Sequence, residues 1–215
     1  TEDNSMTYIQ PLAADRLTTE SVDFSARTLS NNGGGIMVDT ASATELHFAA
    51  VTGTNNGQDW PRYVLDALVA GTQYTVSVWD LAPATDRRGF GIGIIDDNQM
   101  MMAGFFNSAS QHECFNAHGA VGGPTETVIA ISDASMTGIR YSFYVGVDGD
   151  MALNGSISAI DDDGDVLEVV QFGASTTMLA LSNGFLCAFT RRGTNNGTCT
   201  MTYKAQIDKF VPANV

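Results

Sequence analysis

Basic side chains are scarce in this chain of 215 residues. Lysine and arginine together number 10 against 24 aspartates and glutamates, which gives a formal net charge of −14. Only two of the basic residues are lysines, Lys204 and Lys209. A surface of this charge repels phosphate backbones and anionic lipid headgroups. The composition therefore argues against nucleic acid and against anionic membranes as partners.

Long apolar runs are also missing. The chain contains no run of about 18 apolar residues, so no segment is expected to insert into a membrane. Its first ten residues, TEDNSMTYIQ, are polar and acidic and lack the pattern of a secretory signal, although a signal could have been removed. Hydrophobic residues still make up 44% of the chain and charged residues 16%, which is the composition of a folded globular protein.

Cysteine occurs three times, at positions 114, 187 and 199. An odd number argues against a complete disulfide framework. Cys187 and Cys199 each lie six residues from Gly193. If Gly193 begins the tip of a hairpin, these two cysteines could face each other across the strands and form a disulfide. The alternative is that the cysteines are small buried residues in a reducing compartment.

Apolar and polar side chains alternate along much of the chain. A period of two is typical of β-strands that have one buried face and one wetter face. The expected inward sets are Tyr74, Val76 and Val78; Phe90, Ile92 and Ile94; Ile139, Tyr141, Phe143, Val145 and Val147; and Cys199, Met201, Tyr203, Ala205 and Ile207. The expected outward sets include Thr75, Ser77 and Trp79; Arg140, Ser142 and Tyr144; and Thr200, Thr202, Lys204 and Gln206.

Glycine is frequent, with 22 residues, and it often follows asparagine or aspartate. These pairs are typical of tight hairpin turns, because Gly and Asn tolerate positive φ angles. The sequence Gly-Thr-Asn-Asn-Gly occurs twice, at 53–57 and 193–197, and we interpret both copies as turn chemistry rather than a duplicated binding motif. Only residues 11–20 and 61–69 could form a helical turn or two. The sequence therefore predicts an all-β fold with minimal helix, an antiparallel β-sandwich of the jelly-roll type with about ten strands.

The domain organisation follows from the same pattern. Residues 1–20 lack strong alternation and are interpreted as an N-terminal arm or linker. The alternative is an ordinary first strand near Tyr8 and Ile9. Residues 21–215 are then a single β-sandwich domain, which ends in a C-terminal hairpin at 184–211.

Metal ligands are sought first in the segment QHECFNAH. Its His112, Cys114 and His118 could supply three ligands to a soft metal. A closed zinc site needs a fourth ligand, and the remaining histidine, His47, is far away in sequence. We therefore interpret these residues as polar side chains of a loop.

Acidic turns are better candidates for a metal site. Calcium takes six to eight oxygen ligands, which aspartate-rich turns can supply. The alternative is that these turns are simply solvated. No cofactor is expected beyond such a structural calcium ion, whose candidate ligands are Asp148, Asp150, Asp161, Asp163 and Asp165.

Catalytic motifs are missing. The chain contains no nucleophile elbow, phosphate-binding loop or dinucleotide fingerprint. A glycosidase would need a pair of carboxylates, and Glu168 is the one strand glutamate that merits examination. We expect that the protein is not an enzyme.

Glycan binding is better supported by the residue types. Sugars stack their apolar faces on aromatic rings and pair their hydroxyls with polar side chains. Trp60 lies in a polar loop, where it would either bind a ligand or plug the end of the sandwich. Trp79 would either form an exposed platform or pack under another element. The candidate glycan-binding residues are Asn56, Asp59, Trp60, Arg62, Tyr63 and Trp79.

Part of the chain resembles a known family. Segment 71–79 is similar to a strand of carbohydrate-binding-module-like, concanavalin-like jelly rolls, through Gly71, Tyr74, Ser77 and Trp79. Over residues 20–180, the order of motifs resembles that of jelly rolls in tailed-phage virion proteins. The matching residues are Phe106, Asn107, Arg140, Tyr141, Phe143, Gln171 and Gly173. The chain departs from the pattern at Gly138-Ile139-Arg140-Tyr141 and at Phe172, so no ligand residue of the family is carried over.

The resemblance implies a non-enzymatic protein of the phage virion surface. It would decorate the capsid, form a head fibre or bind the receptor as a tail component. Its partners would be other virion subunits, cell-surface glycan or both, and a fibre would be a homotrimer. The alternatives are a secreted, extracellular carbohydrate-binding module or lectin, a structural cement protein without a ligand, and a lectin-like glycoside hydrolase.

Overall fold

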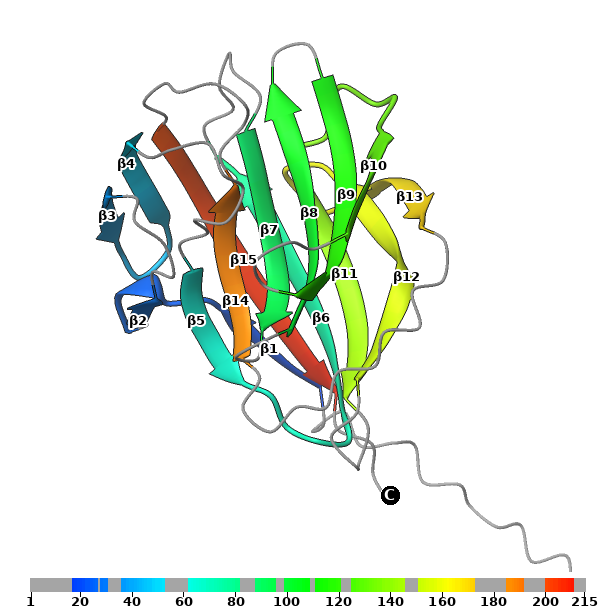
Figure 1. Ribbon diagram of the computed structural model, residues 1–215, viewed down its shortest axis with the longest axis horizontal. Helices are drawn as coiled ribbons and strands as arrows, with labels where there is room; N and C mark the ends of the chain where they lie inside the picture. The colour runs from blue at the N-terminus through cyan, green and yellow to red at the C-terminus, as the bar shows by residue number, and fades with distance from the viewer. Residues whose placement is uncertain are drawn as a thin grey trace, which may run out of the picture.

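A computed structural model of the chain describes residues 17–26, 28–30, 36–52, 62–81, 88–95, 99–108, 111–120, 125–145, 151–172, 185–191 and 200–210. These residues form fifteen β-strands and one 3-10 helix, Phe24–Ala26 (Figure 1). No helix among them is long and apolar enough to cross a membrane. The strands are β1 Leu17–Ser21, β2 Thr28–Ser30, β3 Ile36–Ala41, β4 Leu46–Thr52, β5 Arg62–Ala67, β6 Thr72–Asp80, β7 Arg88–Ile95, β8 Gln99–Ser108, β9 Gln111–Ala120, β10 Thr125–Ala130, β11 Gly138–Val145, β12 Met151–Ile160, β13 Val166–Gln171, β14 Phe185–Arg191 and β15 Thr200–Phe210.

The strands form two antiparallel sheets that pack face to face (Figure 1). The eight-stranded sheet has the order β13-β12-β11-β6-β15-β4-β3, with β1 as an additional partner of β15. The seven-stranded sheet has the order β10-β9-β8-β7-β14-β5-β2. The chain crosses repeatedly from one sheet to the other, as in a jelly roll. The predicted all-β sandwich is confirmed, although its strands are more numerous than the ten expected.

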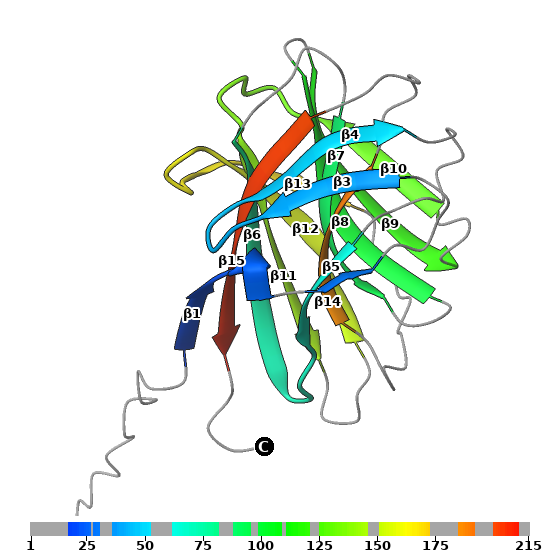
Figure 2. The same ribbon diagram turned by 90° about the vertical axis from the view of Figure 1, so that its left-hand side faces the viewer.

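Strand β15 pairs with two partners along one edge. Its residues 200–203 pair with β4, and its residues 206–210 pair with β1 (Figure 2). Because β4 covers only the first part of this long strand, β1 satisfies backbone groups that would otherwise lack partners in the sheet. The last part of the predicted arm, from Leu17, therefore belongs to the sandwich. Residues 1–16, with Tyr8 and Ile9, lie outside the described residues.

The predicted C-terminal hairpin at 184–211 is wrong. Strand β14 lies in the seven-stranded sheet and β15 in the eight-stranded sheet. Both copies of Gly-Thr-Asn-Asn-Gly lie outside the described residues, and each connects strands of opposite sheets, β4 to β5 and β14 to β15. Turn residues indicate where a strand ends, but they do not specify the sheet to which the next strand belongs. The Asp163-Gly164 turn, by contrast, joins the adjacent strands β12 and β13, and Gly164 has a φ of 86°.

Two segments that lack a clear apolar alternation are strands. Residues 62–67, within the expected helical turns, form β5, and the expected loop around His112 forms β9. In β9 the inward positions include Cys114 but also histidines, so the period of two is hidden by polar residues. Pairing with β8 and β10 on both sides determines the extended conformation of this strand.

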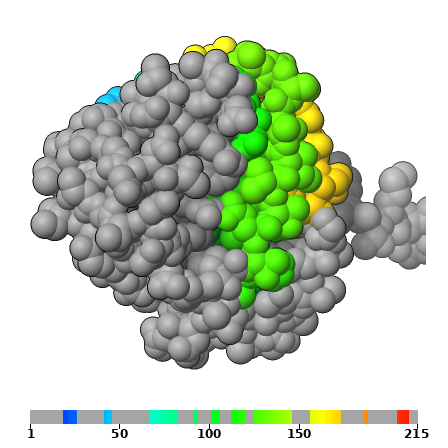
Figure 3. Space-filling model, turned by 45° about the horizontal axis from the view of Figure 1, so that its top comes forward, coloured from blue at the N-terminus to red at the C-terminus, as the bar shows by residue number. Residues whose placement is uncertain are grey.

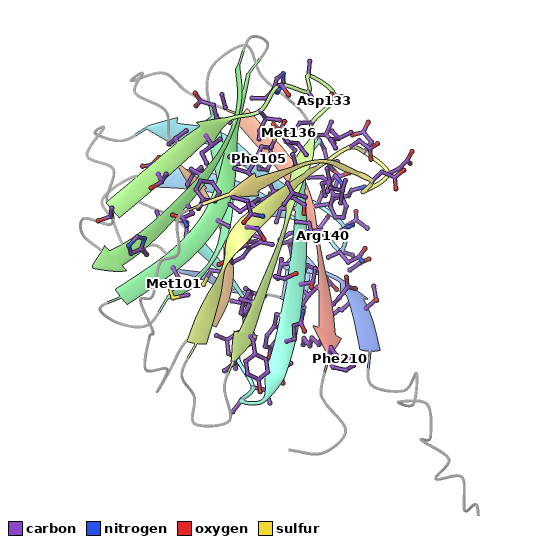
Figure 4. All side chains as sticks on the ribbon, turned by 90° about the vertical axis from the view of Figure 1, so that its right-hand side faces the viewer. Met101, Phe105, Asp133, Met136, Arg140 and Phe210 are labelled. Carbon is purple, nitrogen blue, oxygen red and sulfur yellow. The ribbon has the colours of Figure 1, made fainter. Side chains whose placement is uncertain are left out.

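The core lies between the two sheets. Tyr74 of β6 is fully buried and stacks on Phe143 of β11, with the ring centroids 5.2 Å apart. The Tyr74 hydroxyl accepts a hydrogen bond of 2.8 Å from the amide of Val69. Met101 and Phe105 of β8 contribute from the opposite sheet (Figure 4). The predicted inward residues found in this core are Tyr74, Val76, Val78, Ile92, Ile139, Tyr141, Phe143, Val145, Ala205 and Ile207.

The outer sides of the two sheets differ. At the centre of the seven-stranded sheet, the strand positions that do not face the core are also buried and are apolar or glycine. They include Gly91, Gly93, Met102, Gly104, Phe115 and Ala117. The centre of the eight-stranded sheet presents polar side chains outward instead. Among the described residues, this second surface is the one that suits a polar ligand.

The Tyr74 hydroxyl can be tested by substitution. Tyr74→Phe keeps the stacked ring but leaves the Val69 amide without its acceptor, which is expected to lower the free energy of unfolding by about 1–2 kcal/mol. Tyr74→Ala also empties the core position, with an expected loss of about 3–5 kcal/mol. Urea denaturation measures both losses. Tyr144→Phe, at an exposed position of β11, is the matched control and should change little. Equal losses for Tyr74→Phe and Tyr144→Phe would contradict the assigned role of the hydroxyl.

Candidate functional site

The outer side of the eight-stranded sheet carries a group of polar side chains that we call the polar face. It lies on β6 and its two neighbours, β11 and β15, with β12 beyond β11. Directly paired residues of antiparallel strands point to the same side of the sheet. The register therefore aligns these side chains in three rows: Gly138, Trp79 and Lys204; Ser158, Arg140, Ser77 and Gln206; and Ser142, Thr75 and Asp208.

Trp79 closes one end of the polar face. Its side chain is only 7% exposed, and its indole Nε1 donates a hydrogen bond of 2.9 Å to the carbonyl of Asp161. The ammonium of Lys204 lies 4.6 Å from the centroid of the ring, which is the geometry of a cation–π interaction. Gly138 gives the ring room, because a Cβ there would lie 3.1 Å from Trp79 Cδ1. Trp79 therefore packs under the 161–165 turn and is not an exposed platform.

Arg140, which is labelled in Figure 4, lies near this tryptophan and is held by two hydrogen bonds. Its Nε donates to Ser77 Oγ at 3.2 Å, and its Nη2 donates to the carbonyl of Gly164 at 2.9 Å. The turn approaches closely because Gly164 has no side chain, and a Cβ there would lie 3.2 Å from Nη2. The guanidinium is therefore held in one orientation, and Arg140 as a whole is only partly buried.

The rest of the polar face consists of hydroxyl, amide and carboxylate groups. Thr75 and Ser142 share a hydrogen bond of 2.8 Å between their hydroxyls. The amide of Gln206 donates to the carboxylate of Asp208 at 3.3 Å. The hydroxyl and amide groups can both donate and accept hydrogen bonds, the carboxylate accepts them, and all project from central strands rather than from loops. The arrangement is suited to binding a polar ligand in a defined orientation.

One of the predicted calcium ligands of the 161–165 turn, Asp161, has a structural role. Oδ1 of Asp161 accepts hydrogen bonds from the amides of Asp163 and Asp165, at 3.1 and 2.9 Å. This carboxylate therefore caps the turn itself. Across the described ranges, no three histidine, cysteine, aspartate or glutamate side chains come together to hold a metal ion. Asp148 and Asp150 lie outside those ranges.

In Figure 3 the green surface that includes β9 and β10 borders the yellow surface that includes β13. These strands carry a second group of titratable side chains. Cys114 of β9 is completely buried, and burial, followed by the negative charge of Glu168, raises the pKa of its thiol from 9.0 to about 12. Glu168 accepts hydrogen bonds from the amide and hydroxyl of Ser132, at 3.3 and 3.0 Å. A thiol with so high a pKa stays protonated, which suits neither a metal ligand nor a nucleophile. Glu168 instead links β13 to the segment after β10.

The predicted glycan-binding residues do not form one site in the described part of the chain. Arg62 and Tyr63 begin β5 in the seven-stranded sheet, whereas Trp79 lies in the eight-stranded sheet. Asn56, Asp59 and Trp60 lie outside the described residues, so their role stays a prediction. The same holds for the Cys187–Cys199 disulfide, because Cys187 is buried on β14 but Cys199 is not described.

The residues of the polar face were visible in the sequence as separate outward sets. Thr75, Ser77 and Trp79 alternate with the apolar residues of one strand, and Arg140 with Ser142 does the same in another. What the sequence did not reveal is that β6 lies between β11 and β15. That order joins the sets into one surface.

Comparisons with known proteins give similarities of fold only. No protein-family model matches the chain, and no curated protein matches it. Three solved structures are similar over most of their length. The CBM2 module of the evolved Dit of Lactobacillus casei BL23 phage J-1 is 11% identical, with a TM-score of 0.48 over 93% of this chain and 99% of that one. β-Agarase A from Zobellia galactanivorans is 10% identical, with a TM-score of 0.49 over 98% and 99%.

A functionally unknown protein from Saccharomyces cerevisiae is 13% identical, with a TM-score of 0.47 over 89% of this chain and all of that one. At such identities, and with TM-scores below 0.5, these three similarities carry no argument for function. The polar face has to be interpreted from its own chemistry.

Gly138 provides a test of the Trp79 environment. A Cβ at this position would lie 2.3 Å from the carbonyl oxygen of Val78, so Gly138→Ala must displace β11, β6 or the indole. We expect a loss of about 2 kcal/mol or more in the free energy of unfolding, together with a red shift of tryptophan emission as Trp79 becomes hydrated. Ala130→Val, on the exposed edge strand β10, is the control. Wild-type stability and emission in Gly138→Ala would contradict the close approach.

The buried thiol of Cys114 predicts a dependence of stability on alkaline pH. Its pKa in the folded protein, about 12, lies above the ordinary 9.0, so its contribution to stability is complete below pH 9 and is lost as the pH rises toward 12. The loss should reach a few kcal/mol, on the order of 1.4 kcal/mol for each unit of the shift. Urea denaturation between pH 8 and 11 should show a steeper decline for wild type than for Cys114→Ala. Equal declines of the free energy of unfolding in wild type and Cys114→Ala would show that the pKa of the thiol is not raised.

Proposed function

We propose that this protein is a non-enzymatic, glycan-binding β-sandwich of a phage virion surface, and that its polar face is the glycan-binding surface. The observation that carries the proposal is the alignment of hydroxyl, amide and charged side chains across β12, β11, β6 and β15. A saccharide presents many hydroxyls in a fixed geometry. A row of donors and acceptors on central strands can match that geometry with little loss of side-chain entropy.

The balance of residue types also supports a saccharide. Thr75 and Ser142, which are partly exposed, have short side chains that lose little conformational freedom when they bind. Gln206 and Asp208 offer a donor and an acceptor side by side, which matches the vicinal hydroxyls of a sugar ring.

The virion assignment rests on the sequence resemblance. The motifs at Phe106-Asn107, Arg140-Tyr141 and Gln171 occur in the order found in jelly rolls of tailed-phage virion proteins. The protein would then decorate a capsid, form a head fibre or serve as a receptor-binding tail component. A secreted carbohydrate-binding module would use the same surface as a monomer. Light scattering of the purified chain distinguishes the two, since a fibre head is expected to be a trimer.

The glycan-binding surface can be tested with a panel of soluble oligosaccharides from bacterial envelopes. We expect at least one to bind wild type with a micromolar to millimolar Kd, and the double variant Thr75→Val/Ser142→Ala to bind it roughly tenfold more weakly, since each lost hydrogen bond contributes about 1 kcal/mol. Calorimetry measures the Kd, and chromatography of the incubated oligosaccharide should show no new reducing ends.

Thr127→Ala, on the outer edge strand β10, is the control and should bind like wild type. An unchanged Kd in the double variant would place the glycan elsewhere. Cleavage of the bound oligosaccharide would favour the glycoside hydrolase alternative, for which Glu168 would then be the first residue to substitute.

A further inference from the structure

We infer that the polar face selects an acidic saccharide, whose anionic group binds to Arg140 and Lys204 beside Trp79. The inference rests on the proposed glycan-binding role and specifies its ligand class. A carboxylate of a uronic or sialic acid and a sulfate ester share this chemistry, because both present planar or tripodal oxygens with a negative charge.

Arg140 has hydrogen-bonding capacity that the fold does not use. Its two hydrogen bonds take Nε–H and one N–H of Nη2, and their acceptors are a hydroxyl and a carbonyl. A guanidinium has five N–H donors, so three remain. Within the described part of the chain, Nη1 has no acceptor and the guanidinium has no carboxylate partner. The free donors are both N–H groups of Nη1 and one N–H of Nη2, and an anionic group can accept from them.

Lys204 is the second cation at this end of the polar face. The chain has only two lysines, and the other one, Lys209, pairs with Glu20 at 3.8 Å. Lys204 instead lies against the indole of Trp79, and no carboxylate pairs with it among the described residues. A cation–π contact at a partly exposed site contributes about 0.5–1 kcal/mol, so the ammonium can turn toward an anion at small cost.

The two cations lie close to the same ring. Gly164 approaches both Nη2 of Arg140 and Cζ2 of Trp79, since a Cβ there would lie 3.2 and 3.4 Å from these atoms. Lys204 lies over the face of that indole. Arg140 and Lys204 therefore flank Trp79, and both are partly exposed. The chain has a net charge of −14 and only ten basic residues, yet these two neighbouring cations have no acidic partner among the described residues.

The surrounding acidic residues define what the ligand must provide. Asp163 and Asp165 of the adjacent turn are exposed, and Asp208 lies farther along the polar face. Their charges oppose a small inorganic anion. A saccharide compensates for this repulsion, because its ring hydroxyls bind to Gln206 and Asp208 while its acidic group reaches Arg140. Selective binding thus requires both the negative charge and the sugar ring of the ligand.

The test compares three hexasaccharides by calorimetry: oligogalacturonate, its fully methyl-esterified form and a sulfated galacto-oligosaccharide. We expect at least one acidic ligand to bind tenfold or more tightly than the neutral ester, and its affinity to fall between 50 and 500 mM NaCl. The two acidic ligands distinguish a carboxylate from a sulfate site. Lys204→Gln and Arg140→Gln should each abolish the preference for the acidic ligand, and Lys209→Gln should preserve it.

The outcomes separate this inference from the proposed function. Equal binding of acidic and neutral ligands, with no effect of Lys204→Gln, would overturn the acidic preference and leave glycan binding intact. No binding of any saccharide, including the envelope panel, would overturn both. Arg140 also anchors the 161–165 turn, so Arg140→Gln is interpreted only if its thermal unfolding matches wild type. If Arg140→Gln is less stable than wild type, the binding of Lys204→Gln decides whether the acidic preference exists, because Lys204 contacts the indole.

Discussion

The register of β6 between β11 and β15 is the constraint on which the polar face depends. Tyr74 pairs with Phe143 and stacks on it inside the core, while Ser77 pairs with Arg140 on the outside. A slip of one residue would reverse every side chain of β6 and place Trp79 in the core. The stacked core pair therefore fixes the outer surface as well, and the core and the polar face share one set of backbone hydrogen bonds.

The sequence predicted the parts of the fold that local physics determines. A strand with one buried side needs apolar residues at every second position, and the inward sets of β6, β11 and the end of β15 were identified on this basis. The outward residues of the same strands, including Arg140 and Lys204, were identified at the same time, because they occupy the alternate positions. The Asp163-Gly164 turn was also predicted, because it joins neighbouring strands and its glycine has a positive φ.

The order of the strands in the two sheets could not be predicted from local sequence patterns. The chemistry of the turn between β14 and β15 is that of a hairpin, yet these strands lie in opposite sheets. Trp79 is outward by alternation but buried, because the carbonyl that accepts its indole N–H belongs to Asp161, 82 residues later. Strand β9 was missed because His112 and His118 share the inward side with Cys114. In each case the deciding partner is remote in sequence.

The same remote contacts determine how strongly the polar face can act on a charged ligand. At low salt the net negative charge of the chain repels an approaching anion, and at moderate salt this repulsion is screened beyond about 10 Å. An acidic ligand gains nothing until it reaches Arg140, whose orientation is fixed by Ser77 and Gly164 before binding. Little entropy is then lost in ordering the guanidinium. A surface of this kind favours selectivity in the bound state over rapid electrostatic capture, because its attractive charges act only at contact.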